Sequence, residues 1–457
     1  MFKTDQRIHL IGIGGSGMSG IAEVLLTFGY KVTGSDIHQS ETTKRLEALG
    51  GKIYQGHDTH NIESADVVVY SSAISPDNPE IVYARTNRIP VIPRAEMLAE
   101  LMRLKFGIAV AGAHGKTTTT SMISLVLTKA GLDPTVVVGG RFNDIGSNAR
   151  LGNSNFMVAE TDESDGSFLK LSPIMAVITN IDPEHLDFYK DLEEIKEAFL
   201  TFMNKVPFYG KIIFCMDCPN LRNLIERMER RFISYGLIKG AEVRAEDILL
   251  NGSYSEYKLV VKDKELDRIR VNIPGLHYLS NSLAAVAVGL ELGIDLSIIK
   301  DALAGYSGVH RRFEIKAEVK GTLIIDDYAH HPTEIKATLA TLKLKEPGRI
   351  IAVFQPHRYT RTKALIQEFG KAFNDADMVI VTSIYPAGEK PIPGVDASLI
   401  VENLIKQGHP KVMFIASFPE IVKFLMGVVA PQDAVITLGA GDVWKIGENL
   451  SKELKVS

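Results

Sequence analysis

The sequence predicts an α/β fold of three successive domains: an N-terminal Rossmann-like domain, a central domain with the parallel sheet of a phosphate-loop ATPase, and a C-terminal Rossmann-like domain. Three observations predict it. The length of 457 residues exceeds what one hydrophobic core fills. Apolar runs of strand length alternate with helical patterns along the whole chain. Two of these runs end in glycine-rich segments, and a helical pattern follows each.

Composition narrows the class of protein. Hydrophobic residues make up 45% of the chain and charged residues 23%, as in ordinary globular proteins. The net charge of −4 argues against nucleic acid as a partner, and no apolar run reaches the roughly 18 residues of a membrane span. Two cysteines are typical of a reducing compartment. We therefore expect a cytoplasmic protein that binds neither nucleic acid nor membrane. We also expect a monomer or weak dimer.

The first domain is expected to span residues 1–105. Its apolar runs are short and its helical patterns lie between them, which indicates a parallel sheet covered by helices. Strands are predicted at 8–14, 31–36, 67–74 and 89–94, and helices at 19–29, 42–50 and 96–105.

The central domain is expected at 106–314 and the third at 315–457. Both repeat the order of strand and then helix. Predicted central strands are 106–112, 135–140, 156–161 and 175–181, with helices at 116–131 and 275–293. Predicted strand segments of the third domain are 322–332, 349–357, 378–385, 412–417 and 434–441.

The stretch GAHGKTTTT (112–120) predicts a short phosphate loop. The usual loop has four residues between its two glycines, whereas only Ala113 and His114 separate Gly112 from Gly115. The other parts are present: a strand, a glycine turn, Lys116 and the start of a helix, where backbone N–H groups and the helix dipole favour phosphate. Lys116 supplies a positive charge, and the hydroxyl of Thr117 or Thr118 is a ligand for Mg²⁺. The stretch therefore predicts ATP and Mg²⁺ as cofactors.

A second glycine run, GIGGSG (12–17), follows the first predicted strand. It fits G-x-G-x-x-G at Gly12, Gly14 and Gly17, and Asp36 follows 19 residues after Gly17. By pattern alone this favours an NAD-dependent oxidoreductase. The glycines select only for a pyrophosphate, however, and a UDP-sugar also carries one.

Acidic side chains follow two central strands. The run ETDESD (160–165) comes after the strand at 156–161, and NIDPEH (180–185) comes after the strand at 175–181. Carboxylate and imidazole groups at strand ends beside a phosphate loop can hold a metal ion, although an isolated acidic run is usually a solvated surface.

Cys215 and Cys218 form a C-x-x-C pair. A redox pair is one interpretation, and a zinc site would need two further ligands. We expect instead the end of a strand entering a helix, with Asp217 and Pro219 shaping the turn.

The chain resembles the Mur ligases of peptidoglycan synthesis over nearly its full length. The motifs that carry the resemblance are GAHGKTTTT (112–120), ETDESDGSFL (160–169), NIDPEHLDFY (180–189), PGLHYLSNSLAA (274–285), GVHRRFE (308–314) and DDYAHHPTEI (326–335). The likeness is greatest to the members that add L-alanine, through GIGGSGMSGIA (12–22), FQPHRYTRT (354–362), YPAGEKPIPGV (385–395) and GAGDVW (439–444).

The resemblance implies an ATP-dependent ligase that forms an amide bond. The lactyl carboxylate of UDP-N-acetylmuramate becomes an acyl phosphate, and the amine of L-alanine attacks it to give UDP-N-acetylmuramoyl-L-alanine, ADP and phosphate. The alternatives are a muropeptide-recycling ligase that joins a tripeptide to the same sugar nucleotide, or a sister ligase that adds another amino acid. An NAD-dependent oxidoreductase is a more distant alternative.

The resemblance also implies residue roles at the phosphate and metal sites. Lys116 contacts the β- and γ-phosphates, and Thr117 binds the first Mg²⁺. Glu160 is the predicted acidic metal ligand, with Glu163 as the alternative, and His185 holds the second Mg²⁺. The loop residues predicted to bind ATP are Gly112, Ala113, His114, Gly115, Lys116, Thr117 and Thr118.

For the rest of the nucleotide, Asn281 is predicted to read the adenine edge, and Arg312 and Asp327 to contact phosphate and ribose. The family often has Asn where this chain has Tyr278, and His277 is a possible substitute at that contact.

For the amino-acid substrate, the resemblance implies contacts with Tyr328, His330, His357, Arg358 and Arg361. The two arginines suit this role because a guanidinium can bind a carboxylate through two hydrogen bonds. His330 and His357 are the candidates to accept the ammonium proton, and the residues predicted to be catalytic are Lys116, Glu160, His185, His330 and Arg358. The residues implied for UDP-N-acetylmuramate are Gly12, Gly14, Gly15, Gly17, Asp36, Ser71, Ser72 and Asn148.

Overall fold

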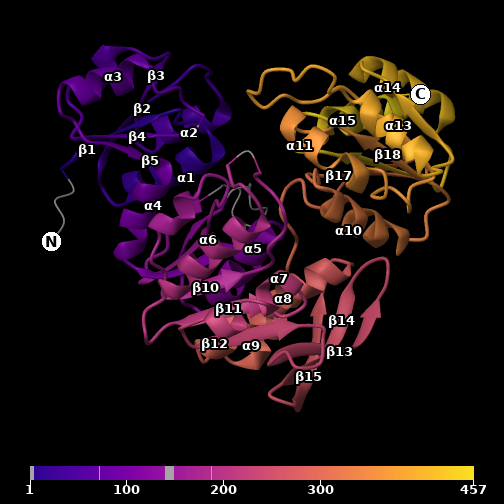
Figure 1. The fold of residues 1–457 in the computed structure, drawn as a ribbon, viewed down its shortest axis with the longest axis horizontal. Coiled ribbons are helices and arrows are strands. Elements are labelled where there is room, and N and C mark those ends of the chain that lie inside the picture. The colour runs from indigo at the N-terminus through magenta and orange to yellow at the C-terminus, as the bar shows by residue number, and fades with distance from the viewer. Residues whose placement is uncertain (1–4, 72, 139–148, 187, 457) are drawn as a thin grey trace. The chain divides into compact units, whose positions relative to one another are not determined.

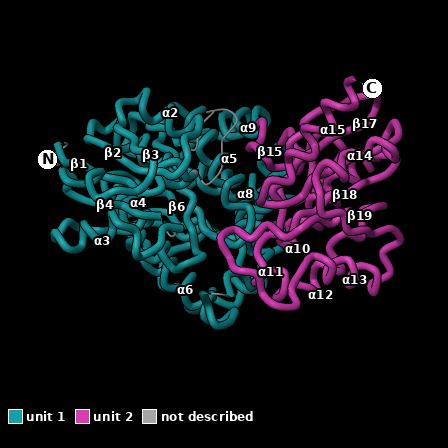
Figure 2. Tube along the Cα trace, turned by 90° about the horizontal axis from the view of Figure 1, so that it is seen from above, with its two compact units in different colours: residues 1–246, 258–269, 280–306 teal, residues 247–257, 270–279, 307–457 magenta. Residues whose placement is uncertain are grey.

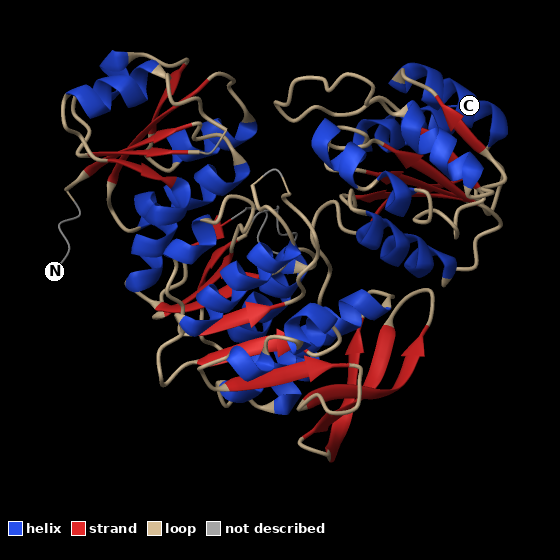
Figure 3. Cartoon of the chain, viewed as in Figure 1, coloured by secondary structure: helices blue, strands red, loops and turns tan. Residues whose placement is uncertain are grey.

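The computed structural model describes residues 5–71, 73–138, 149–186 and 188–456. Three β-sheets follow one another along the chain, and each has helices beside it (Figures 1 and 3). The predicted α/β fold of three successive domains is therefore confirmed. Across the described residues, no helix is both long enough and apolar enough to cross a bilayer.

The first sheet has the strand order β3-β2-β1-β4-β5, and all its described pairs are parallel. Strand β1 lies between β2 and β4, so the chain changes direction across the sheet at β1, where ligands of such sheets bind. The elements are β1 (Arg7–Ile11), α1 (Ser16–Thr27), β2 (Lys31–Asp36), α2 (Glu41–Ala48), β3 (Lys52–Gln55), η1 (Thr59–Ile62), β4 (Val67–Tyr70), α3 (Pro79–Thr86), β5 (Val91–Pro93) and α4 (Arg94–Arg103).

The second sheet has ten strands in the order β15-β14-β13-β12-β11-β10-β6-β9-β7-β8. Strand β6 lies between β10 and β9 and is parallel to both, so the carboxyl ends of the three strands meet at one edge. Its strands are β6 (Phe106–Ala111), β7 (Thr135–Val137), β8 (Ala149–Arg150), β9 (Phe156–Glu160), β10 (Met175–Ile178), β11 (Lys211–Cys215), β12 (Phe232–Gly236), β13 (Val243–Leu250), β14 (Ser255–Val261) and β15 (Lys264–Val271). Its helices are α5 (Lys116–Lys129), η2 (Ser167–Lys170), α6 (Leu192–Asn204), α7 (Pro219–Arg222), η3 (Ile225–Arg227), α8 (Leu276–Glu291) and α9 (Leu296–Ala304).

Strands β13 to β15 were not predicted. Strand β15 reads KELDRIRV, and only Ile269 and Val271 of its eight residues are buried. A strand with charged side chains on most positions lacks the apolar run by which the other strands were recognised.

The C-x-x-C pair adopts the predicted structural arrangement. Cys215 ends β11, Cys218 precedes α7, and Pro219 is the first residue of that helix. The carboxylate of Asp217 accepts the N–H of Leu237 at 2.9 Å. Both thiols are free and buried, and burial raises the pKa of Cys215 to about 11, so this thiol stays protonated.

The third sheet has the order β16-β17-β21-β18-β19-β20. Only the edge pair β16 and β17 is antiparallel among the described pairs of this sheet. The elements are β16 (Glu314–Val319), β17 (Thr322–Asp327), α10 (Pro332–Lys343), β18 (Ile350–Phe354), α11 (Tyr359–Ala364), α12 (Ile366–Phe369), β19 (Met378–Val381), α13 (Ser398–Lys406), β20 (Val412–Phe414), α14 (Phe418–Val428), β21 (Ala434–Leu438) and α15 (Trp444–Val456).

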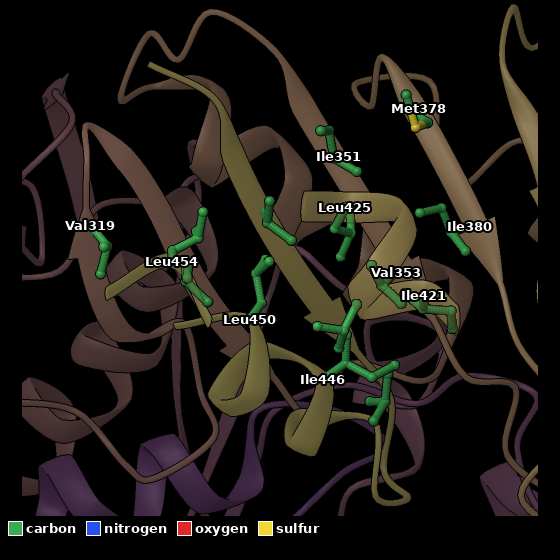
Figure 4. Packing of buried hydrophobic residues seen from close by; sticks show 14 residues of the cluster. Val319, Ile351, Val353, Met378, Ile380, Ile421, Leu425, Ile446, Leu450 and Leu454 are labelled. Atoms are coloured by element: carbon green, nitrogen blue, oxygen red, sulfur yellow. The ribbon is translucent and has the colours of Figure 1, made fainter. Parts of the chain in front are cut away.

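One face of this sheet packs against α14 and α15. Ile351 of β18 and Ile380 of β19 are buried in one cluster with Leu425 of α14 and with Ile446 and Leu450 of α15 (Figure 4). Each fully buried side chain of this kind contributes about 2 kcal/mol of transfer free energy. The cluster therefore fixes β18 and β19 against α14 and α15.

The chain divides into two compact units (Figure 2). Unit 1 comprises residues 1–246, 258–269 and 280–306, and unit 2 comprises residues 247–257, 270–279 and 307–457. The first two sheets thus lie largely in unit 1 and the third sheet in unit 2. The domain limits at 105 and 314 stay predictions.

Candidate functional site

The N-terminal glycine loop is fastened to the end of β2. The N–H groups of Gly12 and Ile13 donate to the carbonyl oxygen of Ser35 at 2.8 and 3.1 Å. The N–H of Gly14 donates to Oδ2 of Asp36 at 2.9 Å. Gly12 has φ +75°, which favours glycine. The structure thus brings Asp36 onto the loop, where its carboxylate holds the loop backbone.

Ser71, a further predicted substrate residue, lies beside this loop. A Cβ on Gly12 would lie 3.9 Å from Cβ of Ser71. A Cβ on Gly17 would lie 3.1 Å from Cζ of Arg94, so the guanidinium covers the position that glycine leaves open. Arg94 also pairs with Oδ2 of Asp162 at 3.0 Å and was not predicted.

Two residues predicted to contact the sugar nucleotide, Ser72 and Asn148, lie outside the described residues.

The phosphate loop rests on the residues that follow β10. His114 donates its N–H to Oδ1 of Asn180 at 2.8 Å, and its carbonyl oxygen accepts the hydroxyl of Thr179 at 2.6 Å. The side-chain amide of Asn180 donates to the same carbonyl at 3.0 Å. The sequence predicted the loop but not this support, because Thr179 and Asn180 come 65 residues or more after it.

Gly112 and Gly115 of the phosphate loop are required both by the backbone conformation and by the lack of space for a side chain. Gly112 has φ +137° and Gly115 has φ +78°. A Cβ on Gly115 would lie 2.7 Å from Oδ1 of Asn281, and one on Gly112 would lie 3.0 Å from the backbone N of Asn180. The loop is therefore a narrow cradle of main chain. Asn281, predicted to read adenine, packs against it.

Lys116 lies over this cradle. Its ammonium donates to Oε1 of Glu163 at 2.7 Å and to the carbonyl oxygen of Ala113 at 3.1 Å. Burial opposes the charge, yet Glu163, with Glu160 and Glu184, raises the pKa of Lys116 above its ordinary value. Lys116 is therefore a partly buried, positively charged group at the start of α5. Thr117 and Thr118 follow it in the buried first turn of this helix.

Glu163, the alternative to the predicted Glu160, lies in a group of possible metal ligands. Among the described residues, Glu163, Glu184 and His185 each offer a ligand atom, and these atoms lie within 4.8 Å of one another. Oε2 of Glu163 is buried without a hydrogen-bond partner in the described structure. Burial raises the pKa of Glu163 to about 7 in spite of Lys116. An unpartnered carboxylate oxygen in such a group is suited to a cation.

His185, a predicted metal residue, is held in an unusual backbone conformation with φ +56°. Its Nε2 lies 3.8 Å from Oε1 of Glu163 and 3.9 Å from Oε2 of Glu184. Strained backbone of this kind persists only where the surroundings fix it, and it is common at functional sites. His185 and Glu163 thus belong to one group, as the sequence predicted for the ends of β9 and β10.

In unit 2, the predicted nucleotide residues His277, Arg312 and Asp327 form a second group. Arg312 lies 3.5 Å from Oε1 of Glu334 and 5.1 Å from the ring of Tyr328. Burial together with the charge of Arg312 lowers the pKa of His277 to about 4, so this imidazole is neutral.

Asp327 has a structural task in this group. Its carboxylate accepts the N–H groups of Phe313 at 2.9 Å and Ala329 at 2.7 Å, and the hydroxyl of Thr338 at 3.2 Å. It thereby fixes the segments that carry Arg312 and Tyr328. Burial raises the pKa of Asp327 to about 6, which Arg312 partly offsets. The predicted contact with ribose is not tested by these hydrogen bonds.

The predicted amino-acid residues also lie together in unit 2, at the ends of β17 and β18. The rings of Tyr328 and His330 are 5.5 Å apart, and those of His330 and His357 are 5.6 Å apart. Nη1 of Arg361 donates to the carbonyl oxygen of His357 at 3.2 Å. Burial, with His330, Arg361 and Arg358, lowers the pKa of His357 to about 3. This imidazole is neutral at physiological pH.

Two residues of this region were missed, Tyr385 and Glu389. The ring of Tyr385 stacks on His357 at a centroid distance of 5.5 Å and an interplanar angle of 9°. Glu389 accepts the backbone N–H of Tyr359 at 2.7 Å. Both lie in YPAGEKPIPGV (385–395), a motif that carried the resemblance, but single-sequence reasoning gave neither a role.

Three sequence profiles of Mur ligase domains match this chain. The "Mur ligase family, catalytic domain" matches residues 7–106, the "Mur ligase middle domain" 110–289, and the "Mur ligase, glutamate ligase domain" 311–441.

Relatives match over the full length. A protein of Geotalea uraniireducens, named UDP-N-acetylmuramate–L-alanine ligase, is 53% identical over 455 residues, which is 100% of this chain and 99% of the relative. The protein of the same name from Geobacter sulfurreducens is 50% identical, with coverage of 100% and 99%. Among solved structures, the UDP-N-acetylmuramate–alanine ligase of Thermotoga maritima has a TM-score of 0.83 and 31% identity, covering 98% of this chain and 99% of that one. A murein peptide ligase of Psychrobacter arcticus has a TM-score of 0.72 and 25% identity, covering 98% of both chains.

Proposed function

The chain belongs to the Mur ligase family, and from this premise we propose that it joins L-alanine to UDP-N-acetylmuramate in an ATP-dependent reaction of peptidoglycan precursor synthesis. The observation that carries the proposal is the short phosphate loop, with Lys116 in its cradle, in a chain that aligns end to end with ligases of this name. The neighbouring glycine run then serves a UDP-sugar, and the oxidoreductase alternative is set aside.

The reaction forms an amide from two groups that do not react on their own. A lactyl carboxylate oxygen of UDP-N-acetylmuramate attacks the γ-phosphorus of ATP, and ADP leaves. The amine nitrogen of L-alanine, after loss of an ammonium proton, attacks the resulting acyl phosphate, and phosphate leaves. The first step brings an anionic carboxylate to an anionic triphosphate, so the protein's contribution there is positioning and charge neutralisation.

Lys116 and the loop are assigned to the triphosphate. Two observations support binding of the triphosphate by this loop. Gly112 and Gly115 have positive φ, and Asn180 and Asn281 lie so close to them that only main chain fits there. The Lys116 ammonium donates hydrogen bonds to Glu163 and to a loop carbonyl oxygen in this structure. We assign it to stabilise the charge on the transferring phosphoryl group.

Mg²⁺ is proposed as the metal. The fit rests on the buried, unpartnered Oε2 of Glu163 beside Glu184 and His185. When bound, the ion supplies positive charge to the phosphate oxygens and the substrate carboxylate. Thr117 and His185 remain assigned as metal residues. Glu163 takes precedence over Glu160 as the carboxylate ligand.

Substrate residues are assigned to each unit. The glycine loop with Asp36 and Ser71 would hold the UDP group, and Arg358 and Arg361 the carboxylate of L-alanine. His330 is favoured as the proton acceptor, since its Nδ1 lies 3.4 Å from the Glu334 carboxylate, whereas the low pKa of His357 makes it a weak base.

Cytoplasmic location, a monomeric or weakly dimeric state, and the absence of nucleic-acid and membrane partners belong to this proposal. A UDP-linked substrate and two free cysteines support the location, and a net charge of −4 supports the absence of nucleic-acid partners.

The proposal is tested by incubating the protein with ATP, Mg²⁺ and UDP-N-acetylmuramate, adding single amino acids, and measuring phosphate release and the mass of the product. We expect release with L-alanine and a product heavier by one alanyl group. Release with a tripeptide and none with L-alanine would instead identify a muropeptide ligase and overturn the assignment.

A further inference from the structure

Arg358 has a backbone conformation that residues other than glycine rarely adopt. Its φ is +71° and its ψ is 141°, at the position just before α11. Such a conformation persists only where neighbouring groups fix it, and an observed case is a reason to ask what the strain serves. The groups that hold Arg358 come from the loop that follows β19.

Glu389 is the first of these groups. Its Oε2 accepts the N–H of Tyr359 at 2.7 Å and that of Thr360 at 3.1 Å, and its Oε1 accepts the hydroxyl of Thr360 at 2.6 Å. Oε1 also lies 4.0 Å from Nη1 of Arg358. One carboxylate thus fixes the two residues after Arg358 and attracts its guanidinium.

Tyr385 holds the other side of Arg358. The N–H of Arg358 donates to the carbonyl oxygen of Tyr385 at 2.9 Å, and the N–H of Tyr385 donates to the carbonyl oxygen of Pro356 at 2.8 Å. The ring of Tyr385 stacks on His357, and the same two residues form a parallel β-bridge, so the segments that carry Glu389 and Arg358 are joined.

We propose that Glu389 is a positioning residue for the amino-acid substrate: it holds Arg358 in its strained conformation and so directs the guanidinium at the substrate carboxylate. The inference rests on the proposed function, because it takes Arg358 as the residue that binds L-alanine. Glu389 itself touches no substrate in this account. Its carboxylate is used by Tyr359 and Thr360, and its effect on binding passes through Arg358.

The first test is Glu389→Gln, measured as the KM for each of the three substrates. Loss of the charge weakens the bonds that fix Arg358, so we expect the KM for L-alanine to rise about tenfold. The KM for ATP, the KM for UDP-N-acetylmuramate and the kcat should change less than about twofold, since their proposed residues lie elsewhere. Glu368→Gln is the matched control: it removes an exposed carboxylate of α12 in the same unit and should change none of them. An unchanged KM for L-alanine, or an equal rise of all three KM values, would overturn the inference.

The second test separates positioning from general stability. In an Arg358→Ala background, Glu389→Gln should raise the KM for L-alanine little further, because the effect requires the guanidinium. A multiplicative effect in that background would contradict the inference. Thr360→Val, which deletes only the hydroxyl bonded to Glu389, should give a smaller rise in the same KM and serves if Glu389→Gln does not fold. If the unmodified protein uses an amino acid other than L-alanine, the proposed function fails, and the Glu389 effect is read on the KM of that amino acid.

Discussion

At the scale of single residues, the ion pair between Lys116 and Glu163 joins a partly buried ammonium to a buried carboxylate. Lys116→Ala removes the positive charge aimed at the transferring phosphoryl group and leaves Glu163 buried without its partner. We expect turnover to fall at least about a hundredfold. Lys129→Ala, at the exposed far end of α5, is the control and should retain turnover. The measurement is kcat, with circular dichroism to establish folding, and near-normal turnover in a folded Lys116→Ala variant would contradict the assignment.

The stability of unit 2 against unfolding should depend on pH through His357. Its pKa is about 3 in the folded protein, against the ordinary 6.5, because of burial and the neighbouring cationic side chains. As the pH falls from 6.5 towards 3, the unfolded chain therefore takes up a proton that the folded chain refuses, and stability decreases.

His357→Asn should reduce the loss of stability between pH 6.5 and 5 by up to about 1.4 kcal/mol per pH unit. Urea midpoints at several pH values, followed by the fluorescence of Trp444 in the same unit, measure this slope. Equal slopes in the two proteins would show that His357 does not titrate differently on unfolding.

At the scale of elements, Gly115 and Gly131 form a natural comparison, because they flank the same helix α5. Gly115 has φ +78° and Gly131 has φ +77°, so an alanine at either position carries the same backbone strain, about 1 kcal/mol. A Cβ on Gly131 meets nothing within 4 Å, whereas one on Gly115 lies 2.7 Å from Oδ1 of Asn281.

We expect both Gly→Ala variants to lower the melting temperature, and only Gly115→Ala to raise the KM for ATP, by about tenfold or more. The reason is that its Cβ displaces the loop from Asn281. Similar KM values in the two variants would mean that the loop tolerates a side chain there.

The elements also show what the sequence could and could not predict. Strand β2 was predicted at its observed bounds, 31–36, and the helix after the phosphate loop was predicted at 116–131 against the observed Lys116–Lys129, because glycine turns and apolar runs mark their ends. Strand β15 was missed since its charges hide the alternation of buried positions.

In the candidate site, some residues within motifs were predicted, whereas residues whose role depends on a partner distant in the sequence, such as Asn180 and Glu389, were not. Lys116 and His185 are predictable from local sequence, whereas Asn180 reaches the phosphate loop only through the pairing of β6 with β10. Glu160 was likewise preferred to Glu163 from local sequence alone, and which of the two binds metal stays a prediction. The two carboxylates are three residues apart, and only the fold shows which one reaches Lys116.

At the scale of the whole molecule, the two compact units should unfold as separate transitions. The single tryptophan, Trp444, lies in unit 2, so its fluorescence reports that unit, while circular dichroism reports both. We expect the two midpoints in urea to differ. UDP-N-acetylmuramate, assigned to the glycine loop of unit 1, should stabilise mainly the transition that tryptophan does not report. Coincident midpoints with and without the ligand would show that the units unfold together.

The way the chain crosses between the units bears on how the protein can be dissected. The turn around Gly252 belongs to unit 2, where its carbonyl oxygen accepts the ammonium of Lys345 at 2.5 Å, and the chain returns to unit 1 before the third sheet begins. An expression fragment cut at Ser307 therefore leaves behind two segments, 247–257 and 270–279, that pack with the third sheet's unit. Fragments for binding studies or crystallisation of that unit should carry these segments, joined by a linker or supplied as a separate peptide.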